Sequence, residues 1–319
     1  MKKLFLVFMV SIMFQAAAFA ETFEWTSGQL GGGWYTMTAG LAKFIEEAHP
    51  DMKIKVVPGG GTANPSKVNN GKSQFGLGLD TLAFLAKDGI DIYKGKPHTE
   101  LMMIGGSLSD TLFHFVKADR AKLSLKQLFT EAKNVNIGVT KAGSSDQKIF
   151  TWIMAYYGTS YKDLKKRGVN VNHANYSELA SQYKDKLIDY VFVNLGLPGA
   201  AVIDMLISRK GDVHSLPEAL MKEFKSSYGY NAGTIKAGTY KNQDTDVHTG
   251  NMGTVILVAK SVSEDAVYKV TKTICENESK LSDIHGSMAS YKCATATKNA
   301  TIPVHPGAAK YYKEMGYIK

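Results

Sequence analysis

The chain has 319 residues, of which 44% are hydrophobic and 21% are charged, as in ordinary globular proteins. Its formal charge of +9 favours an anionic partner, but the basic residues are scattered, and the densest run is only Lys165–Arg167. Nucleic-acid surfaces need clustered basic residues, so the sequence excludes nucleic acid as a partner.

The first twenty residues have the pattern of a cleaved secretory signal. Lys2 and Lys3 precede the apolar run Leu4–Phe14, and Ala18–Ala20 is a cleavage site of the small-x-small type. The apolar run is too short to anchor the chain in a bilayer, and no later run is longer. We therefore predict that residues 1–20 are a signal peptide, that the mature protein is exported to the periplasm, and that it does not span the membrane.

After the signal, short apolar runs alternate with segments of helical periodicity. The expected strands are Thr22–Ser27, Met52–Val57, Phe75–Leu79, Met102–Ile104, Leu112–Val116, Val135–Val139, Val169–Val171, Tyr190–Val193 and Val255–Val258. The expected helices are Tyr35–Ala48, Thr81–Lys87, one that opens at Ser124, Asp146–Tyr157, Glu264–Glu276 and Ala308–Met315. The polar segment Gly229–Asp246 is expected to be a long loop. This alternation predicts parallel α/β sheets, and the length predicts two lobes.

Three loops place small residues between a strand and a helix, namely Gly31–Gly33, Gly59–Thr62 and Gly143–Ser145. A helix N-terminus presents unpaired N–H groups and the positive end of the helix dipole, which favour anions. Glycine allows a ligand to come close to the backbone, although it also serves simple tight turns. Because such loops meet at the carboxyl ends of strands, they are candidates for a ligand site.

Motifs for cofactors and catalysis are incomplete. The glycines Gly31–Gly33 run into bulky aromatic residues, unlike a dinucleotide fingerprint, and Asn70–Ser73 lacks the first glycine of a phosphate loop. The pair Ser145 and Lys148 has no Lys-Thr-Gly partner, and the histidines form no metal motif. We expect no cofactor, no metal and no enzymatic activity.

The only cysteines are Cys275 and Cys293. In an oxidising compartment two cysteines commonly form a disulfide. The alternative is two separately buried thiols, and the sequence leaves both interpretations open.

Four segments carry motifs that occur together. Gly31–Tyr35 is similar to a Gly-Gly-Thr-Tyr-Tyr loop, and Gly60–Asn64 to a Gly-Gly-Ser-x-x-Asn motif. Ala142–Asp146 stands where a Pro-Gly-Ser-Gly-Thr motif is expected, and Ile302–Ala308 matches a C-terminal signature. In these features the chain resembles the TAXI-type solute-binding proteins of tripartite ATP-independent periplasmic (TRAP) transporters.

The resemblance implies a two-lobed periplasmic-binding-protein fold of type II, in which each lobe is a sheet flanked by helices and the ligand cleft lies between them. The first lobe would comprise residues 21–112 and 254–319, and the second lobe residues 113–253. The protein would capture a glutamate-like amino acid or a C4–C5 dicarboxylate such as 2-oxoglutarate by lobe closure. It would deliver this ligand as a monomer to a TRAP permease.

Two alternatives remain at this point. A binding protein of the same fold could serve a membrane sensor kinase instead of a permease. An exported hydrolase could use Ser144 or Ser145 as its nucleophile, but the sequence places no base beside them.

The candidate ligand-binding residues lie in the three loops and at the ends of two strands. They are Gly32, Gly33, Trp34, Tyr35, Gly61, Thr62, Asn64, Asp80, Gly143, Ser144, Ser145, Asp146 and Asn194. We expect Tyr35 to cover a bound acid group, whereas Trp34 belongs either to the cleft or to the core. Asp146 replaces the threonine of the related motif, and it either caps its helix or receives the ammonium group of a ligand.

Overall fold

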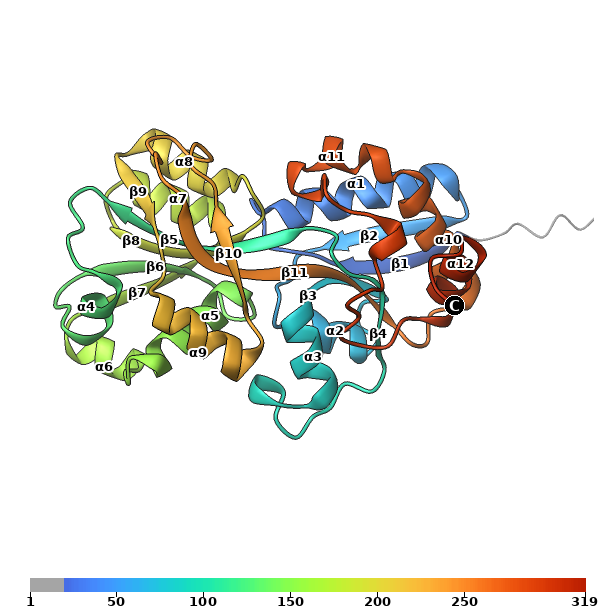
Figure 1. Cartoon of the computed structure of the whole chain (residues 1–319), viewed down its shortest axis with the longest axis horizontal. Coiled ribbons are helices and arrows are strands. Elements are labelled where there is room, and N and C mark those ends of the chain that lie inside the picture. The colour runs from blue at the N-terminus through green and yellow to red at the C-terminus, as the bar shows by residue number, and fades with distance from the viewer. Residues whose placement is uncertain (1–19) are drawn as a thin grey trace, which may run out of the picture.

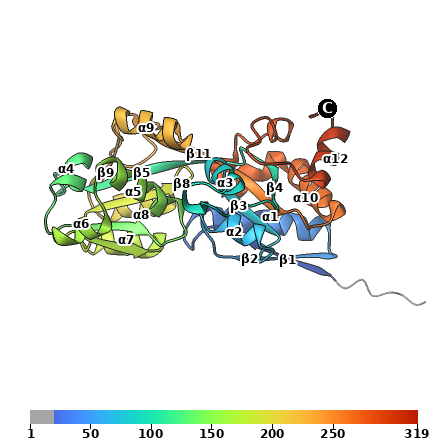
Figure 2. The ribbon, with the colours of Figure 1, turned by 90° about the horizontal axis from the view of Figure 1, so that it is seen from below.

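The structure, a computed structural model, describes residues 20–319, so the predicted signal peptide lies outside the described residues except for Ala20. The chain forms two lobes, each a sheet covered by helices (Figure 1). Strand β5 (Asp110–Ala118) leads from the first lobe into the second, and β11 (Val247–Ala259) returns. A view turned by 90° shows the same two bodies (Figure 2). The predicted α/β fold is confirmed.

The first lobe contains both the start and the end of the described chain. Its strands are β1 (Glu21–Thr26), β2 (Met52–Val57), β3 (Phe75–Leu79) and β4 (Leu101–Gly105). Its helices are α1 (Gly33–Ala48), α2 (Asn64–Asn69), α3 (Asp80–Asp88), η1 (Asp91–Tyr93), α10 (Glu264–Glu276), η2 (Glu278–Lys280), α11 (Leu281–Ile284), η3 (Gly286–Met288), η4 (Cys293–Thr295) and α12 (Pro306–Glu314). Strand β1 pairs in parallel with β2 and β3, whereas β11 runs antiparallel to β3 and β4.

The second lobe is built on the strands between β4 and β11. They are β5, β6 (Asn136–Thr140), β7 (Asn170–Ala174), β8 (Tyr190–Leu195), β9 (Gly211–His214) and β10 (Asn231–Ile235). The helices are α4 (Leu125–Thr130), α5 (Ser145–Tyr156), α6 (Tyr161–Lys166), α7 (Tyr176–Lys184), α8 (Ala200–Ser208) and α9 (Glu218–Tyr228). Strands β6, β7 and β8 pair in parallel, but β5 is antiparallel to β8 and β9.

Strand β11 makes one continuous sheet of the two lobes. Its first half pairs with β10 and β5, and its second half pairs with β3 and β4, so the main strand order is β2-β1-β3-β11-β5-β8-β6-β7. All residues of β3 and β8 are buried, as expected for strands with both faces covered. In the second lobe the rings of Phe115 and Phe192 stack with centroids 4.8 Å apart, and Phe150 of α5 packs edge-on to Phe192 at 5.1 Å. This aromatic core fixes α5 on the sheet.

The expected elements agree with the structure where periodicity is strong and differ where pairing is non-local. Strands β2 and β3 and helix α10 have the predicted bounds. The sheets are parallel as predicted among β1, β2 and β3 and among β6, β7 and β8, but β5 and β11 run antiparallel to their neighbours. The segment Gly229–Asp246 is not only a loop, since it contains β10, which becomes a strand by pairing with β11.

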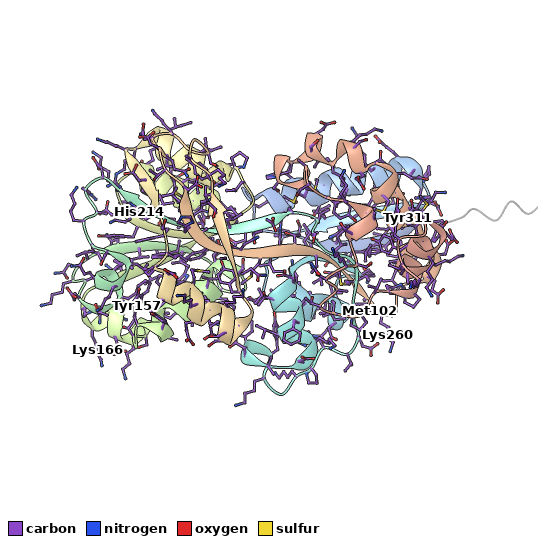
Figure 3. All side chains as sticks on the ribbon, viewed as in Figure 1. Met102, Tyr157, Lys166, His214, Lys260 and Tyr311 are labelled. Atoms are coloured by element: carbon purple, nitrogen blue, oxygen red, sulfur yellow. A yellow bond between two sulfur atoms is a disulfide. The ribbon has the colours of Figure 1, made fainter. Side chains whose placement is uncertain are left out.

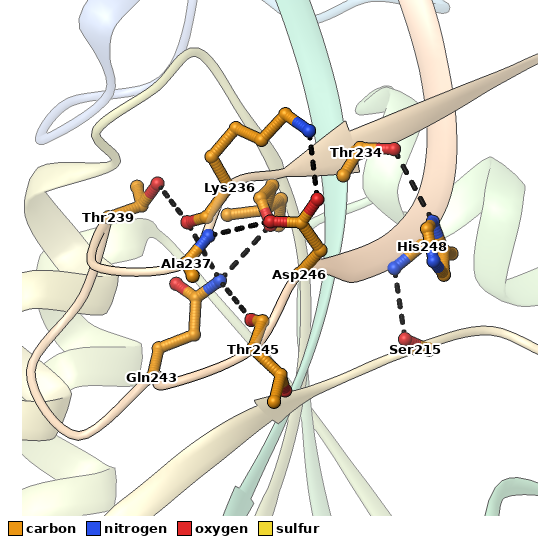
Figure 4. Close-up of polar contacts among 10 residues, drawn as sticks. Ser215, Thr234, Lys236, Ala237, Thr239, Gln243, Thr245, Asp246 and His248 are labelled. Carbon is orange, nitrogen blue, oxygen red and sulfur yellow. Dashed lines mark hydrogen bonds and ion pairs between the residues drawn. The ribbon is translucent and has the colours of Figure 1, made fainter.

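The turn between β10 and β11 is held by its own polar side chains (Figure 4). Gln243 Nε2 donates to the carbonyl oxygens of Lys236 and Thr245 at 3.0 and 3.1 Å, and Asp246 accepts from the N–H of Ala237 at 2.9 Å. Turn-forming residues therefore order this connection.

At the periphery, Lys166 and Lys260 extend from opposite lobes (Figure 3), in line with the scattered positive charge of the sequence. Among residues 20–319, none of the helices combines the length and the apolar character that crossing a bilayer requires.

Cys275, in the last turn of α10, is joined by a disulfide to Cys293, with the two Cα atoms 5.6 Å apart. The bridge closes a loop with a sequence separation of 18 residues. Closing a loop of this length restricts the unfolded chain and stabilises the folded one by about 3 kcal/mol.

Replacing both cysteines by serine should lower the Tm by roughly 5 °C or more, as measured by thermal denaturation. Reductant should produce the same loss in the unmodified protein and none in the double variant. Equal melting of the unmodified protein with and without reductant would contradict a stabilising disulfide.

Candidate functional site

A cavity of about 30 Å³ lies between the lobes, where the loops of both lobes meet. The first lobe contributes Gly28, Gln29, Gly33, Trp34, Gly60 and Gly61 to its wall. Strand β5 and the second lobe contribute Thr111, Ser144, Ser145, Asp146, Tyr176, Asn194, Leu195 and Gly196. A space of this size holds only a water molecule or two, so the walls must move apart before a larger ligand can enter between the lobes.

Glycines bring the backbones of the two lobes into contact around this cavity. A Cβ atom on Gly60 would clash with the carbonyl oxygen of Gly143, and one on Gly32 would lie 2.8 Å from the Tyr176 ring. The N–H groups of Thr62 and Ala63 donate to the Gly143 oxygen at 3.1 and 3.2 Å. The small residues of these loops therefore allow the lobes to close.

This contact changes what the second glycine loop can do. We expected the three loops to offer backbone N–H groups to a ligand. Here the N–H groups of Thr62 and Ala63 bond to Gly143, and Gly60 N donates to Asn64 Oδ1 at 2.9 Å. The helix N-termini that reach the cavity wall are those of α1, at Gly33 and Trp34, and of α5.

Asp146 is the one lining residue with a charged side chain in the described part of the chain. Its carboxylate accepts hydrogen bonds from Asn194 N at 2.7 Å and from Tyr176 Oη at 3.0 and 3.1 Å. The side chain is only 1% exposed, and burial raises the pKa of the carboxyl from 3.8 to about 6. Because Ser144 caps α5 by accepting from Gln147 N, Asp146 is not the capping residue.

Two further acceptors lie in the wall of the cavity. The side-chain oxygens of Asn194 and Gln29 are buried and have no hydrogen-bond partner. The amide nitrogen of Asn194 donates to Thr111 Oγ1 at 3.0 Å and to Ser145 Oγ at 3.2 Å. A buried oxygen without a hydrogen-bond donor destabilises the folded protein. The cavity wall is therefore suited to a ligand that donates hydrogen bonds.

The predicted ligand-binding residues fall into two groups. Those that line the cavity are Gly33, Trp34, Gly61, Ser144, Ser145, Asp146 and Asn194. Those outside its wall are Gly32, Tyr35, Thr62, Asn64, Asp80 and Gly143. Trp34 is held by β11, because its Nε1 donates to Thr254 Oγ1 at 3.1 Å.

Two residues outside the wall have structural contacts of their own. Asn64 fastens the second glycine loop, since its Nδ2 donates to the carbonyl oxygens of Ser27 and Leu77, both at 2.7 Å. Asp80 accepts from Thr81 N at 2.6 Å and from the backbone of Gly253 on β11, and burial raises the pKa of its carboxyl.

Lining residues that the sequence analysis missed include Gln29, Thr111 and Tyr176. Gln29 stands two residues before the glycines of the first loop, so its place in the sequence could have indicated it. Tyr176 follows the N-cap residue Asn175 of α7, which is a local pattern, but its contact with Asp146 joins residues 30 positions apart. Only the folded structure brings these groups together.

The cavity lacks the features of a hydrolase or a metal centre. The Ser144 hydroxyl pairs with Thr140 Oγ1 at 2.5 Å, and Ser145 bonds to Asp146 and Asn194. No histidine is among these partners in residues 20–319, so neither serine has the neighbouring imidazole base of a Ser–His pair. The same part of the chain holds no cluster of three or more side chains able to bind a metal ion.

Asp146→Asn should stabilise the ligand-free protein at pH 7 by up to about 3 kcal/mol. The folded carboxyl binds its proton more tightly than the unfolded one, so the free energy of unfolding rises as the pH falls from about 6 to about 4. Thermal denaturation across this range should show a larger rise in the unmodified protein than in the variant, which keeps the contribution of Asp80. The exposed control Asp244→Asn should leave the rise in place, and parallel curves for all three proteins would exclude a buried Asp146 carboxyl.

The fold and the family are also visible in known proteins. The NMT1-like family matches residues 26–316. The periplasmic binding protein BugD has a TM-score of 0.55 and 12% identity, over 93% of this chain and 98% of that one. MatC from Rhodopseudomonas palustris with bound malate has a TM-score of 0.55 and 9% identity, over 92% and 96%. At such low identity, these likenesses describe the fold only.

The family match is broader than the resemblance found in the loops. It shows the NMT1-like family and does not show the TAXI type that the loop motifs resemble. The periplasmic binding protein BugD and MatC with bound malate share this two-lobed fold. The chain belongs to the NMT1-like family, and its two-lobed fold is that of periplasmic binding proteins.

Proposed function

We propose that this protein captures a glutamate-like amino acid between its lobes and delivers it to a TRAP permease. The observation that carries the ligand class is that the cavity wall contains the buried Asp146 carboxyl and two residues with unpartnered amide oxygens, Asn194 and Gln29. Three acceptors with no lining cation among the described residues favour a ligand that brings a positive charge and N–H donors. An ammonium group meets both needs.

The carboxylate of the ligand would lie at the other side of the cavity. The first turn of α1 reaches the wall through Gly33 and Trp34, whereas the first turn of α5 contains Asp146 and belongs to the acceptor side. N–H groups in the first turn of a helix have no partner inside the helix and favour an anion. One ligand with an ammonium and a carboxylate group therefore uses both sides of the cavity.

A dicarboxylate such as 2-oxoglutarate is the competing ligand, and the malate bound by MatC is a small dicarboxylate. An ionised Asp146 repels such a ligand, whereas a protonated Asp146 tolerates it. The two ligand classes thus have opposite pH dependences. The permease belongs to the proposal through the motif resemblance alone, and so do the lobe boundaries 21–112 with 254–319 and 113–253. The alternative, in which the protein serves a membrane sensor kinase, would use the same ligand site.

Refolded protein should gain thermal stability with L-glutamate and gain little with 2-oxoglutarate at pH 7. At about 100 times the dissociation constant, the gain is about 2.7 kcal/mol. Calorimetric titration should show glutamate affinity falling by up to about tenfold per pH unit below pH 6, because protonated Asp146 cannot hold a cation. Binding of 2-oxoglutarate that tightens at low pH would instead identify a dicarboxylate-binding protein.

Gly60→Ala should weaken binding of the amino acid that gives the largest thermal shift by at least about tenfold, through loss of the closed state. The new Cβ would clash with the Gly143 carbonyl across the lobes, while the backbone of Gly60 needs no left-handed conformation. Gly286→Ala is the matched control, since a Cβ there meets nothing within 4 Å. Equal affinities of the two variants would show that backbone contact between the lobes is not required.

A further inference from the structure

An ion pair outside the cavity links the two lobes. Lys148 Nζ of α5 lies 2.9 Å from Oδ1 and 2.8 Å from Oδ2 of Asp91, which opens η1 in the first lobe. Trp152 Nε1, one turn further along α5, donates to Asp91 Oδ2 at 3.2 Å. One carboxylate of the first lobe thus receives two donors from a single helix of the second lobe.

The two donors are held in place by the second lobe itself. The Lys148 side chain is only 9% exposed, and its Nζ lies 5.3 Å from the centre of the Trp152 ring. Trp152 in turn stacks on Tyr228 of α9, with centroids 4.1 Å apart and an interplanar angle of 8°. A cation over an aromatic ring and partial burial make such a pair stronger than an ordinary surface ion pair.

Asp91 is presented by an unusual backbone. Its φ angle is 53°, in the left-handed region, where aspartate and asparagine are the commonest residues after glycine. Its neighbours Ile90 and Ile92 remain 42% and 45% exposed, so packing does not hold this turn against the second lobe. A non-glycine residue in this conformation at a contact between lobes points to a role in that contact.

Both halves of the contact are connected to the cavity. Tyr93, two residues after Asp91, donates its hydroxyl to the Thr62 carbonyl at 2.7 Å, and Thr62 N bonds to Gly143 across the lobes. On the other side, Asp146 in the cavity wall and Lys148 belong to the same first turns of α5. Separation of the lobes at the cavity therefore separates Asp91 from Lys148.

We propose that Asp91, Lys148 and Trp152 form an interlobe clasp that stabilises the closed arrangement of the lobes in the ligand-free protein. The clasp goes beyond the proposed function, since it requires no particular ligand. Charge-assisted hydrogen bonds of this kind shift an open-to-closed equilibrium by about tenfold or more. The clasp therefore sets the closed fraction, and with it the apparent affinity for any ligand that needs closure.

Small-angle X-ray scattering of the refolded, ligand-free mature protein tests this directly. Asp91→Asn is nearly isosteric, keeps an acceptor for Trp152, and suits the left-handed backbone, so it removes mainly the charge. The variant should have a larger radius of gyration than the unmodified protein, and its open-to-closed ratio should rise about tenfold. Lys148→Met should give the same opening, and the double variant should open no further than either single variant.

Salt and a matched surface pair provide the controls. One molar NaCl should open the unmodified protein less than Asp91→Asn does and leave that variant unchanged, because a partly buried ion pair is only partly screened by salt. Lys222→Met breaks the Glu218–Lys222 pair within α9 and should not change the radius of gyration. Identical radii for the unmodified protein, Asp91→Asn and Lys148→Met, with intact folds by circular dichroism, would overturn the clasp. No ligand is used, so this outcome is independent of the amino-acid proposal.

Discussion

The closed molecule depends on backbone-to-backbone contact between its lobes. Gly60 lies directly against the Gly143 carbonyl, and that carbonyl accepts the N–H groups of Thr62 and Ala63 from the opposite lobe. A side chain at Gly60 would hold the lobes apart, and the cavity that both lobes enclose would not form. The glycines thus act first on the geometry of closure, and a ligand benefits from the enclosure that follows.

Enclosure by the two lobes changes the chemistry of the polar groups in the cavity wall. In open water the carboxyl of Asp146 would be an ordinary acid, but burial raises its pKa to about 6 in spite of the hydrogen bonds from Asn194 and Tyr176. The side-chain oxygens of Asn194 and Gln29 also lack hydrogen-bond donors. A wall with this character would favour cationic donors, in line with the ligand class that we propose.

Much of the fold could be predicted because many of its elements are locally encoded. The apolar runs of β2 and β3 and the periodicity of α10 were sufficient to give their bounds. Strand β10 was missed because Asn231–Ile235 has no apolar alternation and becomes a strand only beside β11. The directions of β5 and β11 were missed for a related reason, since strand direction depends on which distant segment becomes the neighbour.

The sequence by itself determined the class of the molecule: a two-lobed α/β protein with small-residue loops before its helices and a carboxylate in the first turn of α5. Tertiary structure decided what those loops do. It joined Asp146 to Tyr176 and Asn194, 30 and 48 positions away, and it used the donors of the second glycine loop for the opposite lobe. Propensity and capping act over a few residues along the chain, whereas the pKa of a carboxyl and the satisfaction of an amide oxygen depend on groups that only folding and closure bring together.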